Sequence, residues 1–362
     1  MRTRLNANLK YYFFLWLILL ATSAFAQGGL HSMVVETINP ANHIIDSGID
    51  VNKISFRGLS VVNNHTVWAS GTRGVFARST DGITFTIKQI PGYAHVDFRD
   101  IEAFDANRAI VMSSGTPALI LRTIDGGLNW KEVYRNNDSA YFLDAMDFWN
   151  EQSGIVIGDP IKQHFVVLQT NDSGATWKEL SRKNTPTAHE GEAIFAASGT
   201  SLTCIGNKGD LFFVTGGKTA RFIQGNIQNK KWNDVPLPIQ QGNSHQGAFS
   251  VIRAWPKVMV VGGDYLADSI EQYNACWAWD TLFFKPNYFK PIKSKHRPYL
   301  SSVVFQDYIG FIACGTSGVY VYASEEDEWK KISSTPMHVV KKAKQGNAIY
   351  FAGPKGKIGK LG

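Results

Sequence analysis

Residues 97–130 read DFRDIEAFDANRAIVMSSGTPALILRTIDGGLNW. An apolar run at residues 110–112 ends in small residues and Gly115, and a second apolar run at residues 118–121 leads into a polar turn. Short runs of β-branched and aliphatic residues between Gly-rich and Asp-rich turns are typical of β-strands. This stretch therefore predicts strands joined by tight turns.

The same pattern recurs along the chain. Seven copies are marked by a glycine that follows an apolar run: Gly71, Gly115, Gly158, Gly206, Gly263, Gly315 and Gly353. Their mean spacing of about 47 residues matches one four-stranded propeller blade. No long segment shows an amphipathic helical period, which disfavours a helical solenoid. We therefore predict an all-β fold, a seven-bladed β-propeller of four-stranded antiparallel blades.

The polar turn carries a second signature. It reads TIDGGLNW at residues 123–130, TNDSGATW at 170–177 and STDGITF at 79–85, and TGGKT at 215–219 looks like a decayed copy. The form S/T-x-D-x-G-x-T-W is the Asp-box, or BNR, repeat. The carboxylate accepts hydrogen bonds within the hairpin, the glycine adopts a positive φ, and the aromatic packs between blades. We expect structural roles for Asp81, Asp125, Trp130, Asp172 and Trp177, because this hairpin joins the third and fourth strands.

The two ends of the chain predict ring closure. After Gly353 only one further strand remains, so the last blade lacks its outer strand, and residues 33–38 can provide it. Such closure removes an open sheet edge. A length of 362 residues alone suggests about two domains, but the repeat predicts one propeller domain at 27–362.

Residues 1–26 have the pattern of a secretory signal peptide. Arg2, Arg4 and Lys10 precede an apolar run at residues 11–21, and an A-x-A cleavage site follows at residues 24–26. The alternative is an uncleaved anchor, for which the run is short. We expect an exported chain, periplasmic or extracellular, with no membrane span after cleavage.

Composition excludes several classes of protein. The chain is 44% hydrophobic and 19% charged, so it is not a disordered protein. Three cysteines, Cys204, Cys276 and Cys314, exclude a disulfide scaffold, and we expect buried, inert thiols. Loss of the signal peptide lowers the formal net charge from +7 to +4, which does not indicate nucleic-acid binding. No dinucleotide-binding or C-x-x-C motif is present, so we expect no cofactor.

Several segments resemble one family of exported propellers. They begin at Ser55 (SFRGLSVVNNHTVWASG), Asp97 (the stretch quoted first), Phe142 (FLDAMDFWNEQSGIVIGDP), Gly191 (GEAIFAASGTSL) and Val260 (VVGGDY). They are similar to the BNR-repeat propellers of the photosystem II stability/assembly factor family, within the sialidase-like superfamily. The resemblance implies a seven-bladed propeller that binds protein partners. The sequence carries no sign of a photosynthetic context, so the photosynthetic partner is not implied.

A functional site is expected where strand starts and loops meet on one rim. In a propeller the starts of the first strands and the loops between second and third strands share a face. The strand starts supply Arg57, Arg99, Asp100, Asp144, Glu190, Glu192, His245, Arg297 and His338, and the loops supply Asp159, Asn207, Asp264 and Tyr265. The rim is either a wet polar channel, a binding mouth for a ligand or partner, or an active site.

Each alternative gives these residues a different role. In a binding mouth, Arg57, Arg99 and Arg297 would pair with carboxylates or phosphates, and the acidic residues would take cations or sugar hydroxyls. A glycosidase would need two carboxylates at a defined separation, with candidates Asp144, Asp159, Glu190, Glu192 and Asp264. A sialidase would need an arginine triad and a tyrosine, but the usual Arg-Ile-Pro signature is missing and Ser-Phe-Arg-Gly stands at 55–58. No metal site is predicted, since His189 and Glu190 lack the second histidine of a zinc motif.

The fifth copy departs from the repeat. Residues 264–274 and 277–299 are longer than the equivalent segments elsewhere, and the second is rich in aromatics. Such insertions either cover one face and set specificity, or form an ordinary fourth strand with inter-blade packing. We predict a monomeric binding or assembly module with a protein or small carbohydrate ligand at the mouth. The alternative is a carbohydrate-active hydrolase that uses the same rim.

Overall fold

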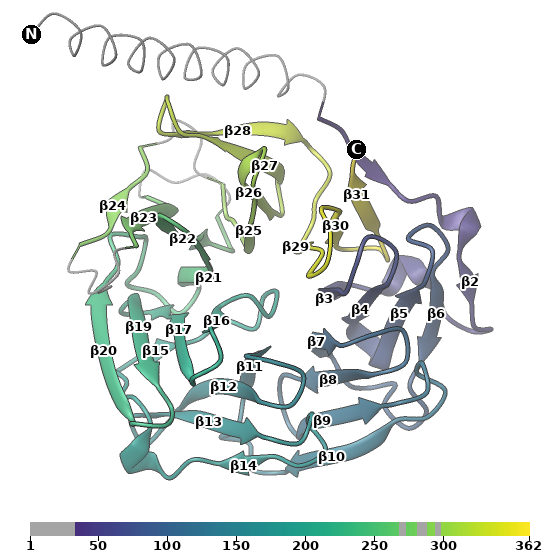
Figure 1. Ribbon diagram of the computed structural model, residues 1–362, viewed down its shortest axis with the longest axis horizontal. Helices are drawn as coiled ribbons and strands as arrows, with labels where there is room; N and C mark the ends of the chain where they lie inside the picture. The colour runs from purple at the N-terminus through teal and green to yellow at the C-terminus, as the bar shows by residue number, and fades with distance from the viewer. Residues whose placement is uncertain (1–32, 268–272, 281–287, 294–297) are drawn as a thin grey trace, which may run out of the picture.

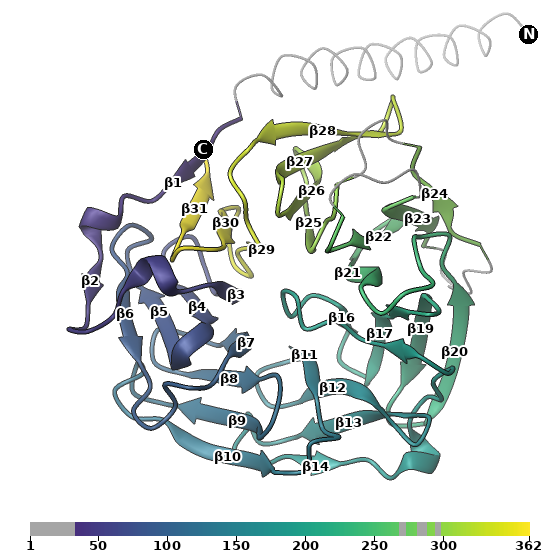
Figure 2. The same ribbon diagram turned by 180° about the vertical axis from the view of Figure 1, so that it is seen from behind.

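The computed structural model describes residues 33–267, 273–280, 288–293 and 298–362. The predicted signal peptide, Arg297 and parts of both fifth-copy insertions lie outside these residues. Seven sheets surround a central channel, each with its first strand innermost (Figures 1 and 2). The prediction of a seven-bladed β-propeller is confirmed. Within the described ranges, no helix is long and apolar enough to cross a membrane.

The first three blades follow the predicted plan. Blade one contains β3 (Phe56–Val61), β4 (Val67–Gly71), β5 (Val75–Ser79) and β6 (Thr86–Gln89). Blade two contains β7 (Phe98–Ala103), β8 (Ala109–Ser113), β9 (Ala118–Thr123) and β10 (Lys131–Asn136). Blade three contains β11 (Leu143–Phe148), β12 (Gly154–Ile161), β13 (His164–Thr170) and β14 (Lys178–Glu179). Neighbouring strands within each of these blades are antiparallel.

The other four blades complete the ring. Blade four contains β16 (Leu202–Ile205), β17 (Asp210–Val214), β19 (Arg221–Asn226) and β20 (Lys231–Pro236), blade five β21 (Gln246–Ala254), β22 (Lys257–Asp264), β23 (Ala275–Trp279) and β24 (Lys290–Pro291), blade six β25 (Ser302–Gln306), β26 (Gly310–Gly315), β27 (Gly318–Ala323) and β28 (Glu328–Ser333), and blade seven β29 (Val339–Lys342), β30 (Ile349–Ala352), β31 (Ile358–Leu361) and β1 (Val35–Thr37).

Ring closure occurs as predicted. The strand β1 pairs antiparallel with β31, with Val35 opposite Leu361 and Thr37 opposite Gly359. Figure 2 shows the C-terminus beside β1. The first segment of the propeller thus becomes the outer strand of the last blade.

Three short strands extend the plan in ways that the repeat did not predict. The strand β2 (Ile44–Ile45) pairs in parallel with the outer strand of blade one. The strands β15 (Glu192–Ala193) and β18 (Gly216–Gly217) join the inner end of blade five through a bridge between Gly216 and Gly247. In the part of the chain that the structure describes, the remaining regular elements are single 3₁₀ turns: η1 (Pro40–Asn42), η2 (Val51–Lys53), η3 (Thr72–Gly74) and η4 (Arg182–Asn184).

The strand assignment of the fourth copy was wrong. Gly206 and Asn207 lie in the turn between the first and second strands, β16 and β17, and not between the second and third. The segment 215–219 follows the second strand, so it is not a decayed Asp-box turn. The error arose because residues 194–201, which look like an inner strand in sequence, form an irregular segment that precedes β16.

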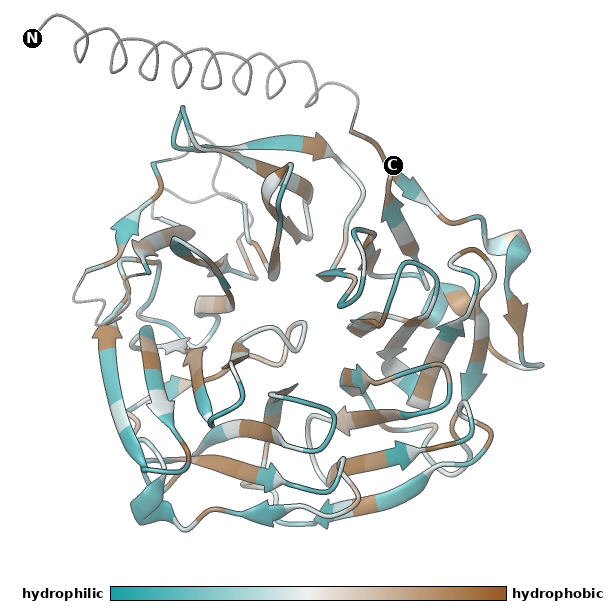
Figure 3. Ribbon diagram, viewed as in Figure 1, coloured by the Kyte–Doolittle hydropathy of each residue, from teal (hydrophilic) through white to brown (hydrophobic). Residues whose placement is uncertain are grey.

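The core lies between neighbouring blades. Strands such as β4 and β8 are buried along their whole length, because each face of a blade packs against the next blade. Trp68 and Phe76 of blade one, for example, pack with Phe98 and Leu119 of blade two. The outermost strands β10 and β20 are mostly polar, β10 partly buried and β20 mostly exposed (Figure 3).

The Asp-box turns form the expected hydrogen-bonded hairpins. Thr123 donates to Asp125 at 2.9 Å, and Asp125 accepts from the backbone N–H of Asn129 at 2.9 Å. The equivalent bonds to Asp172 measure 2.8 and 2.9 Å. In blade one, backbone N–H groups lower the pKa of Asp81 to about 2. These bonds fix the turns between third and fourth strands.

The Asp-box tryptophans pack against the inner faces of the blades. Trp130 of blade two meets Phe76 and Trp68 of blade one edge-on, at centroid distances of 5.2 and 6.4 Å. Trp177 of blade three meets Phe148 edge-on at 6.0 Å. Each aromatic ring therefore buries apolar area where the hairpin folds back.

Candidate functional site

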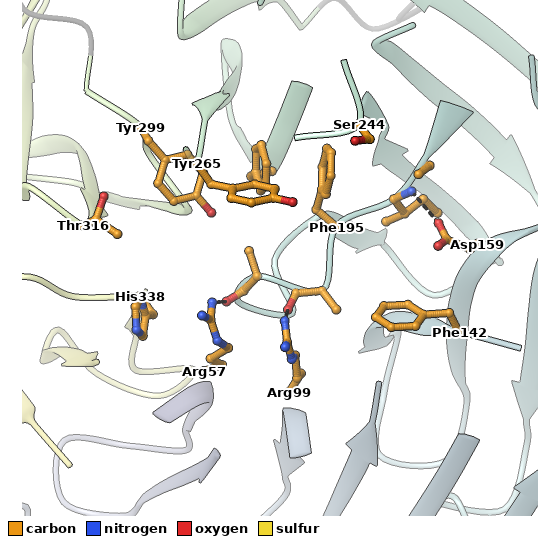
Figure 4. A pocket seen from close by; sticks show the side chains of 15 residues that line it. Arg57, Arg99, Phe142, Asp159, Phe195, Ser244, Tyr265, Tyr299, Thr316 and His338 are labelled. Carbon is orange, nitrogen blue, oxygen red and sulfur yellow. Dashed lines mark hydrogen bonds between the residues drawn. The ribbon is translucent and has the colours of Figure 1, made fainter. Parts of the chain in front are cut away.

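A hollow of about 520 Å³ opens at the channel mouth, and every blade contributes to it (Figure 4). Its lining consists of two arginines, a histidine, one carboxylate, five aromatics, two hydroxyl residues and a backbone segment: Arg57, Arg99, His338, Asp159, Phe142, Phe195, Phe249, Tyr265, Tyr299, Ser244, Thr316 and residues 193–197. Its volume lies within the usual range for ligand sites, about 300–1,000 Å³. We call it the mouth pocket.

β-Bulges place several of these side chains. The pairing register of the first strand shifts at its start in four blades: between Phe56 and Gly58, Phe98 and Asp100, Leu143 and Ala145, and Ala248 and Ser250. The extra residues are Arg57, Arg99, Asp144 and Phe249. A bulge re-aims the side chain of the extra residue. The mouth pocket receives three of these four side chains.

The two arginines stand side by side with little countercharge (Figure 4). Arg57 Nη1 donates to the carbonyl of Ala197 at 3.4 Å, and Arg99 Nη1 donates to that of Ala196 at 3.3 Å. Both distances exceed the usual 2.9–3.0 Å. The nearest ion pair of Arg99, with Asp97, spans 3.8 Å, and its buried Nε has no partner among the described residues. Burial, and then the charge on Arg99, lower the pKa of Arg57.

A wall of aromatic rings faces the arginines. Phe195 stacks on Phe249 at 4.0 Å, and Tyr299 meets Phe249 edge-on at 4.8 Å. Tyr265 closes the outer side, 6.4 Å from Phe195, and is 48% exposed. The pocket thus pairs a cationic floor with an apolar wall and one ring at the rim.

His338 is a neutral neighbour of the arginines. Burial lowers its pKa to about 3, and the charges on Arg57 and Arg99 contribute to the shift. Its imidazole therefore stays uncharged at physiological pH, so it adds no positive charge. Burial raises the pKa of Tyr299, which keeps that hydroxyl protonated.

An irregular segment, residues 194–201, which we call the channel segment, contributes its first residues to the pocket lining beside the arginines. Ser198 donates to the carbonyl of Ser301 in blade six at 2.7 Å, and Thr200 donates to Ser250 in blade five at 2.7 Å. Gly199 lies against the carboxyl group of Asp100 in blade two. Figure 1 shows the loop beside β16 reaching into the centre of the ring. The channel segment therefore ties blade four to blades one, two, three, five and six.

The acidic residues of blades two and three are mostly behind the pocket. Asp159 lies on its wall, accepts the N–H of Ile194 at 2.9 Å, and has its pKa raised to about 6 by burial. Asp144 is fully buried, and burial, then the charge on Asp159, raise its pKa. Asp100 is also buried, and burial raises its pKa to about 8. Asp159 is thus the carboxylate that reaches the pocket among the described residues.

The acidic residues of blade four lie outside the pocket. Glu192 forms a buried, bidentate ion pair with Arg221, at 2.9 and 2.6 Å. Glu190 is exposed and pairs with Lys218 at 3.0 Å. Neither residue belongs to the pocket lining.

In blade five, His245 and Asp264 stand behind Tyr265. Asp264 bonds His245 Nδ1 at 2.7 Å and accepts from Gln246 at 3.0 Å. The ring of His245 lies 6.1 Å from that of Tyr265. This network supports the rim residue from outside the hollow.

The geometry favours binding over carboxylate catalysis. Of the five carboxylates proposed for a glycosidase, only Asp159 lines the pocket. Among the residues that the structure describes, no three His, Cys, Asp or Glu side chains gather as metal ligands would. Cys204, Cys276 and Cys314 are free, and the last two are buried.

Sequence reasoning did not name the aromatic wall. Phe142, Phe195, Phe249 and the carbonyls of residues 196 and 197 carry no motif, because apolar residues at strand starts resemble core residues, and Tyr299 was noted only within the aromatic-rich stretch 277–299. A signal was present in the recurring pair Phe-Arg at 56–57 and 98–99, where an aromatic core residue precedes an arginine. Phe249 lies at the matching bulge of blade five.

Comparisons with known proteins agree with the propeller fold and with the resemblance of the sequence to the assembly-factor family. Residues 94–221 match the family model of the photosynthesis system II assembly factor YCF48. A YCF48 structure bound to a D1 peptide is similar, with 12% identity, 89% of this chain and 98% of that chain covered, and a TM-score of 0.61. YCF48 from Cyanidioschyzon merolae is also similar, with 15% identity, 90% of this chain and 98% of that chain covered, and a TM-score of 0.63.

More distant propellers share the same architecture. The Pan2 WD40 domain of Neurospora crassa is 11% identical, with a TM-score of 0.57. The match covers 85% of this chain and 88% of that chain. Among curated proteins, none matches the sequence. The chain is therefore a seven-bladed propeller similar to the photosystem II assembly factors.

Proposed function

We propose that this protein is an exported, protein-binding propeller of the assembly-factor type. Its mouth pocket holds an extended segment of a partner protein. A carboxylate of that segment binds Arg57 and Arg99, and an apolar side chain packs on Phe195, Phe249 and Tyr299.

The observation that carries this proposal is the pair of under-compensated guanidinium groups. Among the described residues, their donors meet two long carbonyl contacts and one distant carboxylate. A carboxylate placed between them would gain charge-assisted, bidentate hydrogen bonds. Since Arg57 is half-buried, such bonds would form in a less polar medium than water and be correspondingly stronger.

The shape of the pocket supports a polypeptide ligand. The arginine floor and the aromatic wall enclose a hollow of about 520 Å³. A hollow with one charged and one apolar side suits an amphipathic segment. Tyr265 stands exposed at the rim, and tyrosine is enriched in protein interfaces. A structurally similar propeller has been solved with a peptide bound.

Site-specific photocrosslinking in the native host tests the proposal. A photoreactive amino acid replaces exposed Tyr265, and a control chain carries it at exposed Ile124 on the Asp-box face. We expect a discrete crosslinked protein from position 265 that is lost when Arg57→Met and Arg99→Met are combined. Crosslinks that persist in the double variant, or that arise equally from position 124, would contradict a mouth-bound partner.

Export rests on the N-terminal pattern alone. Residues 1–26 have a basic start, an apolar run and an A-x-A site. We expect the protein isolated from its host to begin at Gln27 and to fractionate outside the cytoplasm. N-terminal sequencing that finds an intact Met1 in the cytoplasmic fraction would overturn this part of the proposal.

A further inference from the structure

A second hollow lies between blades five and six, on the face opposite the mouth. It is formed by the turn between β21 and β22 and the turn between β25 and β26, blades that are adjacent in Figure 1. Turns between first and second strands share a face with the Asp-box hairpins. The hollow measures about 240 Å³, and its main walls are Trp255, Lys257, Phe305, Ile309, Phe311 and Tyr322. We call it the five–six pocket.

Lys257 brings an unneutralised charge to this apolar hollow. Its Nζ lies 4.4 Å from the ring centroid of Trp277 and 5.6 Å from those of Trp279 and Tyr322. No carboxylate or other acceptor of the described residues pairs with it. Burial lowers the pKa of Lys257 and the charge on Lys290 adds to this shift, while the charge on Asp327 opposes it.

The nearby carboxylates are already engaged. Asp327 accepts from the Tyr322 hydroxyl at 2.7 Å and pairs with Lys290 at 3.4 Å. Asp280 accepts from Arg253 Nε at 2.6 Å through one oxygen, and its other oxygen is buried without a partner among the described residues. Because cation–π contacts replace only part of the hydration of an ammonium group, an incoming carboxylate would be stabilised at Lys257.

Exposed aromatics surround the hollow. Trp255 is 74% exposed, and Tyr308, beside Ile309 in the blade-six turn, is 88% exposed. Trp279, in contact with Lys257, is 58% exposed. Large aromatic side chains left in water around a small apolar hollow are typical of the anchor regions of protein interfaces.

We propose that the five–six pocket is a second protein-docking site, which takes an acidic segment with one bulky apolar side chain. The apolar side chain fills the hollow, and a neighbouring carboxylate of the same segment binds Lys257 Nζ. The volume supports an anchoring side chain, because it lies below the range of about 300–1,000 Å³ that encloses a whole small ligand. The charge of Lys257 sets the preference for an acidic neighbour.

Blocked dipeptides test this chemistry without knowledge of the partner. The probes are acetyl-Asp-Phe-amide, its neutral counterpart acetyl-Asn-Phe-amide, and sodium octanoate as a free carboxylate with an alkyl chain. Binding to the protein isolated from its host is followed by the indole N–H signal of Trp255 in NMR spectra, assigned with Trp255→Phe. We expect acetyl-Asp-Phe-amide to shift this signal and to bind at least about five-fold more tightly than the neutral dipeptide.

Three variants separate the possible causes of the shift. Lys257→Met should remove the preference for the acidic dipeptide, and Ser324→Phe, on the exposed edge of the hollow, should weaken both dipeptides. Arg57→Met, at the mouth pocket, should change neither. The proposal is overturned if both dipeptides bind equally, if Lys257→Met has no effect, or if octanoate binds more tightly than the acidic dipeptide.

Discussion

At the residue scale, the mouth pocket depends on single extra residues in the inner strands. Arg57 and Arg99 each occupy the bulge of a first strand, so their side chains leave the alternating pattern of the sheet and enter the channel. Asp144 occupies the same place in blade three but is covered there. The bulge and the residues that cover it thus together determine which side chains reach the mouth pocket.

A buried ion pair holds blade four to the segment before the channel. Glu192 accepts from Arg221 and also from Thr215 at 2.6 Å. We expect Glu192→Ala to lower the free energy of unfolding by about 3 kcal/mol, because it leaves a buried guanidinium group with one partner fewer. Arg221 retains Asp234 at 3.1 Å, which limits the loss.

Urea denaturation measures this change, and Glu190→Ala is the matched control. Glu190 is two residues away, exposed, and paired with Lys218 across the surface, so its loss should leave the urea midpoint unchanged. Equal effects of the two substitutions would show that the buried pair does not stabilise this region.

At the element scale, the channel segment is the main departure from the repeat. Repeat spacing predicted seven blades, the closing strand and the Asp-box turns, because these depend on local patterns that recur. It could not predict residues 194–201, since their apolar and small side chains resemble an inner strand. Arg57, Arg99 and His338 were placed on the rim by strand position, and Asp159 and Tyr265 by loop position, whereas Phe249 required knowledge of the bulge and Phe195 that of the channel segment.

Two glycines test how tightly the channel segment is packed. Gly199 has φ +65°, and a Cβ there would lie 2.2 Å from the carboxyl group of Asp100. Gly206 has φ +59° with open space around it. Substitution by alanine at either position costs about 1 kcal/mol of stability, because the backbone there is left-handed. Only Gly199→Ala also introduces a steric clash.

We therefore expect Gly199→Ala to destabilise the protein by about 3 kcal/mol and Gly206→Ala by about 1 kcal/mol. Thermal unfolding of the two variants gives the comparison. If the two melting temperatures fall by the same amount, the channel segment is not packed against blade two as described.

At the scale of the whole molecule, buried carboxyl groups should make stability depend on pH. Burial raises the pKa of Asp100 from 3.8 to about 8, so the folded state holds a proton that the unfolded state releases. Its contribution is complete below about pH 4 and is lost as pH rises through 8. The lowered pKa of His338 changes the free energy of unfolding only below about pH 6.5.

We expect the free energy of unfolding to fall between pH 6.5 and 8.5, on the order of 2 kcal/mol for Asp100. Urea unfolding at both pH values measures it, and Asp100→Asn should make the fall shallower. Asp81→Asn is the control, since the pKa of Asp81 is about 2 and lies far below this window. A stability that rises between these pH values would contradict the protonated state of Asp100.

The ring as a whole brings seven strand ends to one rim, and we propose that this rim binds a partner carboxylate. The most direct measurement is a double-mutant cycle on binding. Its ligand is a synthetic copy of the partner segment that crosslinking at position 265 identifies. One arm combines Arg57→Met with Arg99→Met, and the other replaces the carboxylate of the synthetic segment by an amide. We predict that each change alone weakens binding by about ten-fold or more, and that both together weaken it no further. Losses that multiply would contradict a bond between this carboxylate and the arginine pair.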